Sequence, residues 1–316
     1  LSRGLGDVYK RQGQISDVGT IECEHGDCRA RVQDVLRVGE DQVLEVVVEQ
    51  GALPQGESVV ARVDHLARHA TECNHTATHL LQAALRERVG GHVRQAGSYV
   101  GPDKLRFDFS HGHALSAEEL RDVEDRVNEW IARNDHVRPI TTTLEEAKRL
   151  GAMALFGEKY GDVVRMVEIG DGEYSRELCG GTHVRSTAEI GAFHILSETS
   201  SSANVRRIEA LTGPAAVELL REHDRLLKDV AASLRTRPES APEAVRALVS
   251  GHKELERASR ESVAGVTVDL DALVARVSET AGAPVLAATV DVPDAKALLE
   301  LVDRLKGLVA DAAILL

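Results

Sequence analysis

His75-Thr76-Ala77-Thr78-His79 places two histidines four residues apart, and Cys179-Gly180-Gly181-Thr182-His183 places a cysteine and a histidine at the same interval much further along the chain. This interval brings two side chains onto one face of a helix. Three imidazoles and one thiolate form a ligand set that zinc prefers in a tetrahedral site. Because the motifs are far apart, only folding can bring them together. The predicted metal is Zn²⁺, and its predicted ligands are His75, His79, Cys179 and His183.

Each motif alone has a simpler explanation. Two histidines four apart on an amphipathic helix often occur by chance, and a small buried cysteine is common in protein cores. Both motifs occur in one chain, and the glycine and threonine residues beside them do not continue the apolar face of a helix. Together these observations favour a metal site. Thr76 argues against a zinc peptidase, because those enzymes carry a glutamate directly after the first histidine.

The composition is that of an ordinary folded protein of two or three domains, with 316 residues of which 43% are hydrophobic and 28% charged. No apolar run approaches the roughly 20 residues of a membrane span, and no secretory signal stands at the start, so we expect no membrane partner and a cytoplasmic location. Four irregularly spaced cysteines predict no disulfide framework. Cys23, His25 and Cys28 fit no standard zinc knuckle, so no second metal is expected there.

A net charge of −13 argues against nonspecific nucleic-acid binding, which needs a basic surface. Recognition of a shaped nucleic acid through local basic patches remains open. The candidate patches are Arg86, Arg88 and Arg94, and the pair Arg206-Arg207. The alternative is that these arginines balance nearby acids on a solvated surface.

The first half of the chain predicts a β-rich segment followed by helices and a hairpin. Residues 13–64 contain short β segments with turn signals, among them a strand at 43–48, and predict a small β-barrel. A helix is expected from near Asn74 to Val89, with Leu80, Leu81, Ala84 and Leu85 on its core face. A hairpin turning at 101–103 follows, and a capping box at Ser116 opens a helix to about Asn134.

The second half predicts strands, then two long helices, then an α/β unit. Strands are expected at 163–169, 193–197 and 207–211, with a loop at 199–203, which completes an α+β domain over 65–213 with a mostly antiparallel sheet. A long helical arm follows over 214–264. A helix at 270–281, a strand at 285–290 and a helix at 295–309 predict an incomplete α/β unit over 265–316.

Both ends of the chain are expected to be unnatural boundaries. Residues 1–12 fit nothing downstream and resemble translated sequencing-adapter read-through, so we treat them as a non-native leader. Residues 312–316 have the composition of a strand with no turn after it. We therefore expect a fragment of a longer protein.

Several runs of this sequence together resemble alanyl-tRNA synthetase beyond its aminoacylation domain. The motifs at 74–81 and 177–183 are similar to the two editing motifs of that family. The other matching runs lie at 13–19, 93–98, 105–110, 151–161 and 205–210. The resemblance is firm from Gly13 to Gly213 and looser afterwards, and the aminoacylation domain itself has no counterpart here.

The resemblance implies that the parent protein attaches alanine to tRNA(Ala) using ATP, and that this piece hydrolyses Ser-tRNA(Ala) and Gly-tRNA(Ala). It also implies that Thr78 and Gln95 hold the substrate or the attacking water. Backbone N–H groups at Gly180 and Gly181 could stabilise the developing oxyanion, since glycine permits close approach. Arg94, Arg206 and Arg207 are the predicted contacts to the tRNA acceptor end. The C-terminal region implies a homodimer in the intact parent.

Three other interpretations stay open from the sequence. In the first, the zinc has only a structural role and the domain binds tRNA without catalysing a reaction. The chain could be a free-standing alanyl-tRNA editing protein, although the long arm after Gly213 argues against this. Threonyl-tRNA synthetase uses a related metal motif in editing, but the runs at 151–161 and 205–210 favour the alanine enzyme. Thr78 could also bond back to a helix carbonyl, and Gln95 could face solvent.

Overall fold

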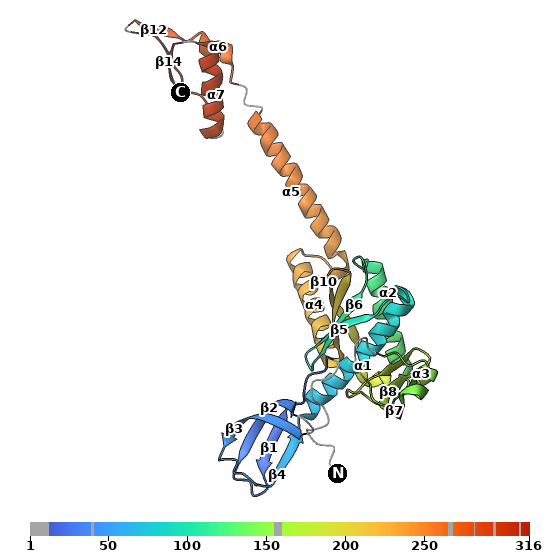
Figure 1. The fold of residues 1–316 in the computed structure, drawn as a ribbon. Helices are drawn as coiled ribbons and strands as arrows, with labels where there is room; N and C mark the ends of the chain where they lie inside the picture. Colours follow the sequence, from blue (N-terminus) through green and yellow to red (C-terminus); the bar gives the residue numbers. More distant parts are fainter. Residues whose placement is uncertain are drawn as a thin grey trace. The chain divides into compact units, whose positions relative to one another are not determined.

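The computed structural model describes residues 13–316, except 39–40, 155–159, 265–267, 281, 293–294 and 310. The predicted leader therefore lies outside the described residues, as does part of the run at 151–161. The chain divides into two compact units, Leu1–His223 and Asp224–Leu316. The long helix α4 (Gly213–Ser233) crosses the division. The chain is an α+β protein with mainly antiparallel sheets, as predicted (Figure 1).

The first unit begins with a four-stranded antiparallel sheet in the order β3-β2-β1-β4. The strands are β1 (Gly19–Cys23), β2 (Arg29–Val38), β3 (Asp41–Gln50) and β4 (Val59–Val63). The predicted closed barrel is wrong for the described residues, because β3 and β4 are the two edges and do not pair with each other. β3 exposes most of its side chains, and only Leu44 and Val46 of this strand pack against the core of the sheet. This order, with the last strand beside the first, is that of a Greek key.

A disulfide joins Cys23 and Cys28 across the β1–β2 hairpin, which the irregular cysteine spacing did not predict. The hairpin brings the two Cα atoms to 5.1 Å, within the range that a disulfide spans. The Cys23 N–H also donates to the Cys28 carbonyl at 3.1 Å. Pairing here follows from hairpin register, which spacing alone does not reveal.

The central element of the first unit is helix α1 (His65–Arg88), whose start is nine residues earlier than predicted. Asp64 caps it by accepting hydrogen bonds from the backbone N–H groups of Leu66 and Ala67, each at 3.0 Å. Every residue from Cys73 to Leu85 is buried. The predicted core face is confirmed, since the side chains of Leu80, Leu81, Ala84 and Leu85 are fully buried.

Helix α1 packs against an antiparallel sheet in the order β10-β11-β6-β5. The strands are β5 (Gln95–Val100), β6 (Leu105–Ser110), β10 (Phe193–Ser202) and β11 (Val205–Thr212). The predicted hairpin is confirmed. The predicted loop at 199–203 is mostly strand, because the β10–β11 ladder continues to the Ser202–Val205 pair. Only Ala203 and Asn204 make the turn, and Asn204 has the left-handed φ of 57° that such a turn needs.

Two further elements complete the core around α1. Helix α2 (Ala117–Arg133) begins at the predicted capping box, in which Ser116 and Glu119 bond to each other's backbone N–H groups. An antiparallel sheet in the order β7-β8-β9 carries the second metal motif at its end. Its strands are β7 (Val137–Thr143), β8 (Val163–Ile169) and β9 (Ser175–Leu178), and the short helix α3 (Leu144–Arg149) follows β7. The predicted strand at 163–169 is confirmed as β8. Two 3₁₀ turns lie at Gly170–Gly172 (η1) and Thr187–Ile190 (η2).

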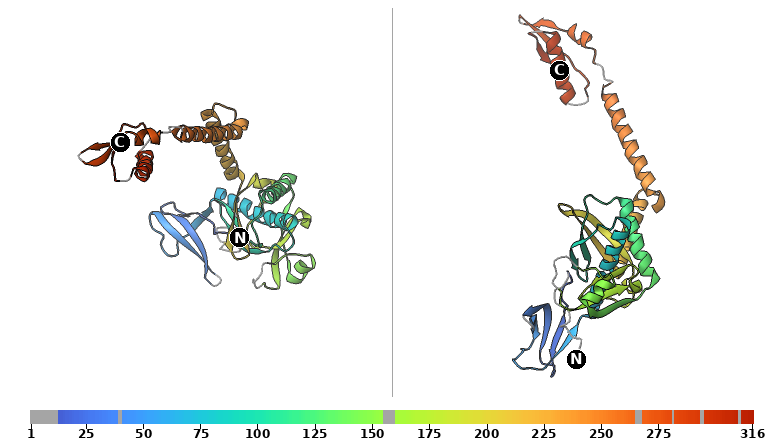
Figure 2. Two further views of the ribbon diagram at one scale, coloured as in Figure 1. Left: turned by 90° about the horizontal axis from the view of Figure 1, so that it is seen from above. Right: turned by 45° about the vertical axis from the view of Figure 1, so that its right-hand side comes forward.

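The second unit contains helix α5 (Ala241–Ala264), after the 3₁₀ turn η3 (Pro238–Ser240), and a small α/β part (Figure 2). That part consists of α6 (Leu270–Val274), β12 (Ser278–Thr280), β13 (Ala283–Ala287), α7 (Ala295–Leu308) and β14 (Ala313–Leu315). The predicted helix at 270–281 is shorter, because Ser278 to Thr280 pair with β13. β13 and β14 run parallel and are joined through α7, which confirms the predicted α/β connection. Among the described residues, every helix is too short or too polar to cross a membrane.

Candidate metal centre

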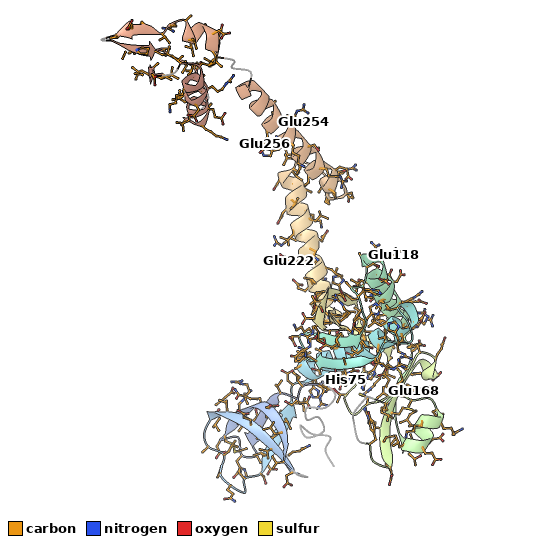
Figure 3. All side chains as sticks on the ribbon, turned by 45° about the horizontal axis from the view of Figure 1, so that its top comes forward. His75, Glu118, Glu168, Glu222, Glu254 and Glu256 are labelled. Carbon is orange, nitrogen blue, oxygen red and sulfur yellow. A yellow bond between two sulfur atoms is a disulfide. The ribbon has the colours of Figure 1, made fainter. Side chains whose placement is uncertain are left out.

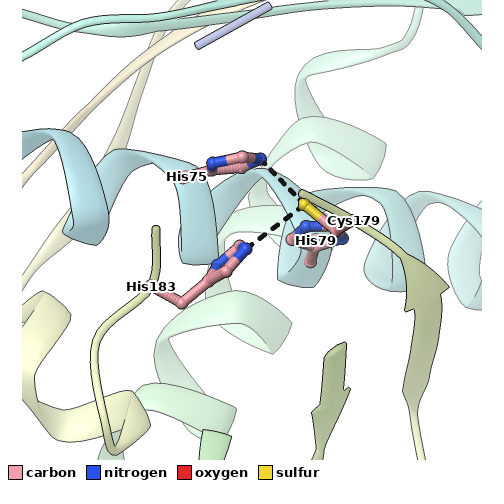
Figure 4. A group of neighbouring side chains, drawn as sticks. All are labelled: His75, His79, Cys179 and His183. Atoms are coloured by element: carbon pink, nitrogen blue, oxygen red, sulfur yellow. Dashed lines mark hydrogen bonds between the residues drawn. The ribbon is translucent and has the colours of Figure 1, made fainter. Parts of the chain in front are cut away.

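The fold brings the four predicted ligands into one cluster. His75 and His79 lie one turn apart in the buried middle of α1, Cys179 directly follows β9, and His183 lies in the loop before η2 (Figures 3 and 4). One ligand atom from each residue lies within 4.8 Å of all the others. The Cys179 Sγ lies 3.4 Å from His75 Nε2 and 3.3 Å from His183 Nε2. The two distant motifs therefore form one site.

The donor set and its spacing fit zinc. A tetrahedral ion with sulfur at ~2.3 Å and nitrogen at ~2.0–2.1 Å holds those two atoms ~3.5 Å apart, close to the separations found here. His79 Nε2 is buried and has no hydrogen-bond partner among the described residues. A buried polar atom without a partner is costly, and a bound cation would satisfy it. The four residues thus have the chemistry and the arrangement of a metal site.

The outer nitrogen of each histidine ring has its own polar partner. His75 Nδ1 lies 2.6 Å from Gln14 Oε1, His79 Nδ1 lies 3.0 Å from Glu177 Oε2, and His183 Nδ1 lies 3.2 Å from Thr76 Oγ1. Thr76 Oγ1 donates its own proton to the Glu72 carbonyl at 2.9 Å, so it can accept from His183. Such outer partners fix the ring orientation and leave Nε2 for the metal.

The charges around the cluster favour a thiolate at Cys179. Burial raises the pKa of the Cys179 thiol, but the His75 and His183 imidazoles lower it by more, so it lies well below its ordinary value. Burial, helped by His75, lowers the pKa of His183 to about 3. Burial lowers the pKa of His79, whereas the Glu177 carboxylate and Cys179 together raise it to about 10. A thiolate at Cys179 is the form that binds metals.

The loop after Cys179 is held by a buried arginine and by its glycines. The Arg165 guanidinium donates to the carbonyls of Cys179 and Gly181 at 2.8 and 2.7 Å. Burial lowers the pKa of Arg165, although the Cys179 charge opposes this. A Cβ on Gly181 would collide with the His75 ring and with Gln14 Oε1. Gly181 is therefore required for close approach at this point.

Thr78 and Gln95 line a small cavity beside the ligands. Ser98 and Glu177 also line it, together with His75, His79, Leu178 and Cys179. The Thr78 hydroxyl donates to the Asn74 carbonyl at 2.8 Å. This is the hydrogen bond to a helix carbonyl that the sequence left open as an alternative role for Thr78. The hydroxyl can still accept a hydrogen bond. Gln95 Nε2 donates to Ser98 Oγ at 3.0 Å, so Gln95 faces the cavity and not only solvent.

The three arginines predicted to contact tRNA have partners within the protein. Arg206 forms a two-point ion pair with Glu198, and Arg207 forms one with Asp108 at 2.7 and 2.8 Å. Arg94 donates to the carbonyls of Gly91 and Val93 at 2.6 and 2.9 Å. The ion pairs favour the alternative that Arg206 and Arg207 balance nearby acids.

Sequence reasoning assigned no role to Gln14, Thr76, Arg165 or Glu177. Thr76 and Glu177 lie inside the two motifs that contain the ligands. A polar residue so near a ligand in the sequence could have been predicted to contact the site. Glu177 shows this well, since its carboxylate is buried two residues before Cys179. Arg165 gives no such local signal. Gln14 lies in the matching run at 13–19, but its contact to the site depends on tertiary structure, as does that of Arg165.

The chain is similar to known alanine–tRNA ligases and to a domain family of tRNA synthetases. Residues 164–209 match the family described as the threonyl and alanyl tRNA synthetase second additional domain. The chain is 46% identical over 307 residues to the alanine–tRNA ligase of Geobacillus thermodenitrificans, and 41% identical over 309 residues to that of Acetivibrio thermocellus. Each alignment covers 96% of this chain. The resemblance to alanine–tRNA ligases is confirmed.

The match to alanine–tRNA ligases covers only part of those proteins. The alignments span 34% of the Geobacillus and Acetivibrio enzymes, so the chain spans about a third of the length of the curated relatives it matches. The alanine–tRNA ligase of Pseudomonas entomophila gives the same picture, with 43% identity over 35% of its length. The family match at 164–209 includes Cys179 and His183, while His75 and His79 lie outside it.

Proposed function

We propose that this chain is the editing part of an alanine–tRNA ligase and hydrolyses the ester of Ser-tRNA(Ala) and Gly-tRNA(Ala). The observation that carries the proposal is the convergence of His75, His79, Cys179 and His183 beside a cavity lined by Thr78 and Gln95. The similarity to alanine–tRNA ligases supplies the substrate class. We assign this activity to residues 65–213, preceded by the sheet of 13–64 and followed by the helical arm and the α/β part.

A second hydrolytic site answers a selectivity problem in charging alanine. A pocket for alanine rejects glycine only through a missing methyl group, which changes selectivity about 10–200-fold. Serine differs by one hydroxyl, which a small pocket also rejects poorly. An editing site that hydrogen-bonds this hydroxyl spares alanine, because alanine leaves a polar partner unsatisfied. Serine is therefore the expected better substrate.

We propose a role for each candidate residue, and among them Thr78 and Gln95 line the cavity beside the ligands. Zinc held by all four ligands would have no open coordination position, so its proposed role is to organise the pocket and orient the aminoacyl group. Gln95 is placed to hold the substrate or a water through its amide, and Thr78 can accept a hydrogen bond from either. Backbone N–H groups at Gly180 and Gly181 are proposed oxyanion donors. The proposed contacts to the acceptor end are Arg94, Arg206 and Arg207. Arg206 and Arg207 would contact it while they keep their ion pairs to Glu198 and Asp108.

A second candidate function has support from the ligand count. Four protein ligands close the coordination of zinc, as in structural sites. The chain could then hold the acceptor end of tRNA without hydrolysing its ester. We prefer editing because the cavity reaches three of the four ligands together with the amide of Gln95.

Three wider properties belong to the proposed parent protein. It attaches alanine to tRNA(Ala) with ATP, it acts in the cytoplasm, and it forms a homodimer through its C-terminal region. The names of the relatives support the first of these.

The test is hydrolysis of seryl-tRNA(Ala) by the purified chain with zinc and with a chelator. We expect metal-dependent release of serine, abolished by His75→Ala and retained by His65→Ala, which changes an exposed histidine of the same helix. Tight tRNA binding without release of serine would favour the binding module. Full hydrolysis by a His75→Ala protein that has lost its metal would exclude the proposed role of the site.

A further inference from the structure

We propose that Gln14 is a positioning residue of the metal centre, and that the segment before the first sheet therefore completes the site. Gln14 lies 61 positions before His75 and is only 2% exposed. The inference rests on the metal site of the proposed function, but its test measures metal affinity and ring protonation instead of ester hydrolysis.

The hydrogen bonds of Gln14 determine which nitrogen of His75 carries the proton. Gln14 Oε1 accepts the backbone N–H of Thr182 at 3.0 Å, and Gln14 Nε2 donates to Thr182 Oγ1 at 2.9 Å. These two bonds fix the amide orientation, so the atom 2.6 Å from His75 Nδ1 is an acceptor. His75 Nδ1 must then donate its proton. The lone pair remains on Nε2, the nitrogen that lies 3.4 Å from the Cys179 thiol.

Gln14 also joins the two halves of the site. His75 belongs to α1, whereas Thr182 belongs to the loop that carries Cys179 and His183. The amide of Gln14 bonds to both, and Gly181 approaches it so closely that a Cβ there would collide with Oε1. Gln14 thus helps to set the separation between the helix ligands and the loop ligands, together with Thr76, which contacts His183 Nδ1.

The backbone around Gln14 is anchored, so the side chain is held in place. Val100 N donates to the Gly13 carbonyl at 2.8 Å and Ile15 N donates to the Val100 carbonyl at 3.0 Å, which adds this segment to the edge of β5. Asp17, buried at 6% exposure, forms a two-point ion pair with Arg68 of α1. The segment is therefore bonded to both the sheet and the helix that frame the metal centre.

The test compares two substitutions of Gln14 in the full chain. Gln14→Leu keeps the approximate size but removes the acceptor, and Gln14→Glu keeps an acceptor for His75. Gln33→Leu, at an exposed position of β2, is the matched control. Zinc affinity is measured by competition with a chromophoric chelator, and the protonated nitrogen of His75 is identified by ¹⁵N NMR. Circular dichroism checks that each protein is folded.

We expect Gln14→Leu to weaken zinc binding roughly 10–100-fold, the usual effect of losing an outer partner of a metal-bound histidine. It should also lose the preference for the Nδ1 proton on His75. Gln14→Glu and Gln33→Leu should bind zinc like the original protein.

Unchanged zinc affinity in Gln14→Leu would overturn the inference, and so would an equal loss in Gln14→Glu, which would indicate packing instead of hydrogen bonding. A chain that binds no zinc overturns both this inference and the proposed function. Zinc binding that depends on Gln14, without hydrolysis of seryl-tRNA, supports the inference and contradicts the proposed hydrolysis.

Discussion

At the scale of single residues, the metal centre is defined by close contacts that leave little freedom to substitute. Gly181 lies against the ring of His75 and the amide of Gln14, with no space for a Cβ. The residue types and spacing of the two motifs predicted the cluster that His75, His79, Cys179 and His183 form in the fold. They did not predict Gln14 or Arg165, because the sequence carries no sign of which distant polar side chain will meet the ligands.

We predict that Gly181→Ala disrupts the metal centre. The added methyl group must displace His75 or Gln14, and such overpacking costs about 1–3 kcal/mol of unfolding free energy. Urea unfolding and chelator competition measure the effect on stability and on zinc affinity. The control is Gly91→Ala, because a Cβ there meets open space. Equal zinc affinity in the two variants would show that the contact at Gly181 is unimportant.

We also predict that the stabilisation from Tyr174 is lost at high pH. The Tyr174 hydroxyl donates to Asp135 Oδ2 at 2.6 Å, and its ring stacks on Trp130. Burial, followed by this bond to Asp135, raises the pKa of Tyr174 above its ordinary value. The protonated Tyr174 hydroxyl stabilises the fold fully at any pH below the pKa of tyrosine in the unfolded chain, about 10. This stabilisation is lost as the pH rises from there towards the pKa of Tyr174 in the folded protein.

The measurement is the difference in unfolding free energy between the original protein and Tyr174→Phe. At pH 8 the phenylalanine variant should be less stable by roughly 1.5–3 kcal/mol, the contribution of a hydrogen bond to a charged group. The difference should shrink above pH 10. A difference that grows with pH contradicts the assigned direction.

At the scale of elements, local signals predicted the helix and strand types better than their ends and their closure. The capping box at Ser116 is a local signal and was confirmed, and the strand predicted at 163–169 was confirmed as β8. The start of α1 was missed because the cap, Asp64, lies nine residues before the buried stretch. The closed barrel was wrong because closure depends on the pairing of β3 and β4, which are edges here.

The capping box makes a prediction for α2. Ser116→Ala removes the acceptor for the Glu119 N–H, which lies at 3.2 Å, and should cost about 1 kcal/mol of unfolding free energy. Ser116→Thr keeps the hydroxyl and should cost little. Chemical denaturation of both variants measures this difference, and equal stability of the two would mean that the cap contributes nothing.

At the scale of the whole molecule, the candidate metal site belongs entirely to the first compact unit. All four ligands and their outer partners lie between Gln14 and His183, within Leu1–His223. The division could not be read from sequence, because the long helix α4 crosses it without a break.

Zinc should therefore stabilise one unit only. Binding at a hundredfold excess over Kd adds about 2.7 kcal/mol to the stability of the unit that contains the site. Hydrogen exchange followed by mass spectrometry should show slower exchange in the first unit, strongest in α1, and unchanged exchange after Asp224. Equal protection in α7 would contradict a site confined to the first unit.

The most direct test of the central claim is the ratio of two hydrolysis rates, for seryl-tRNA(Ala) and for alanyl-tRNA(Ala), with the zinc-loaded chain. A site that hydrogen-bonds the serine hydroxyl should favour serine by about 1–3 kcal/mol, or roughly 5- to 160-fold. That ratio would establish a selective editing site at the four ligands. Equal rates for the two esters, or release of neither amino acid, would contradict it.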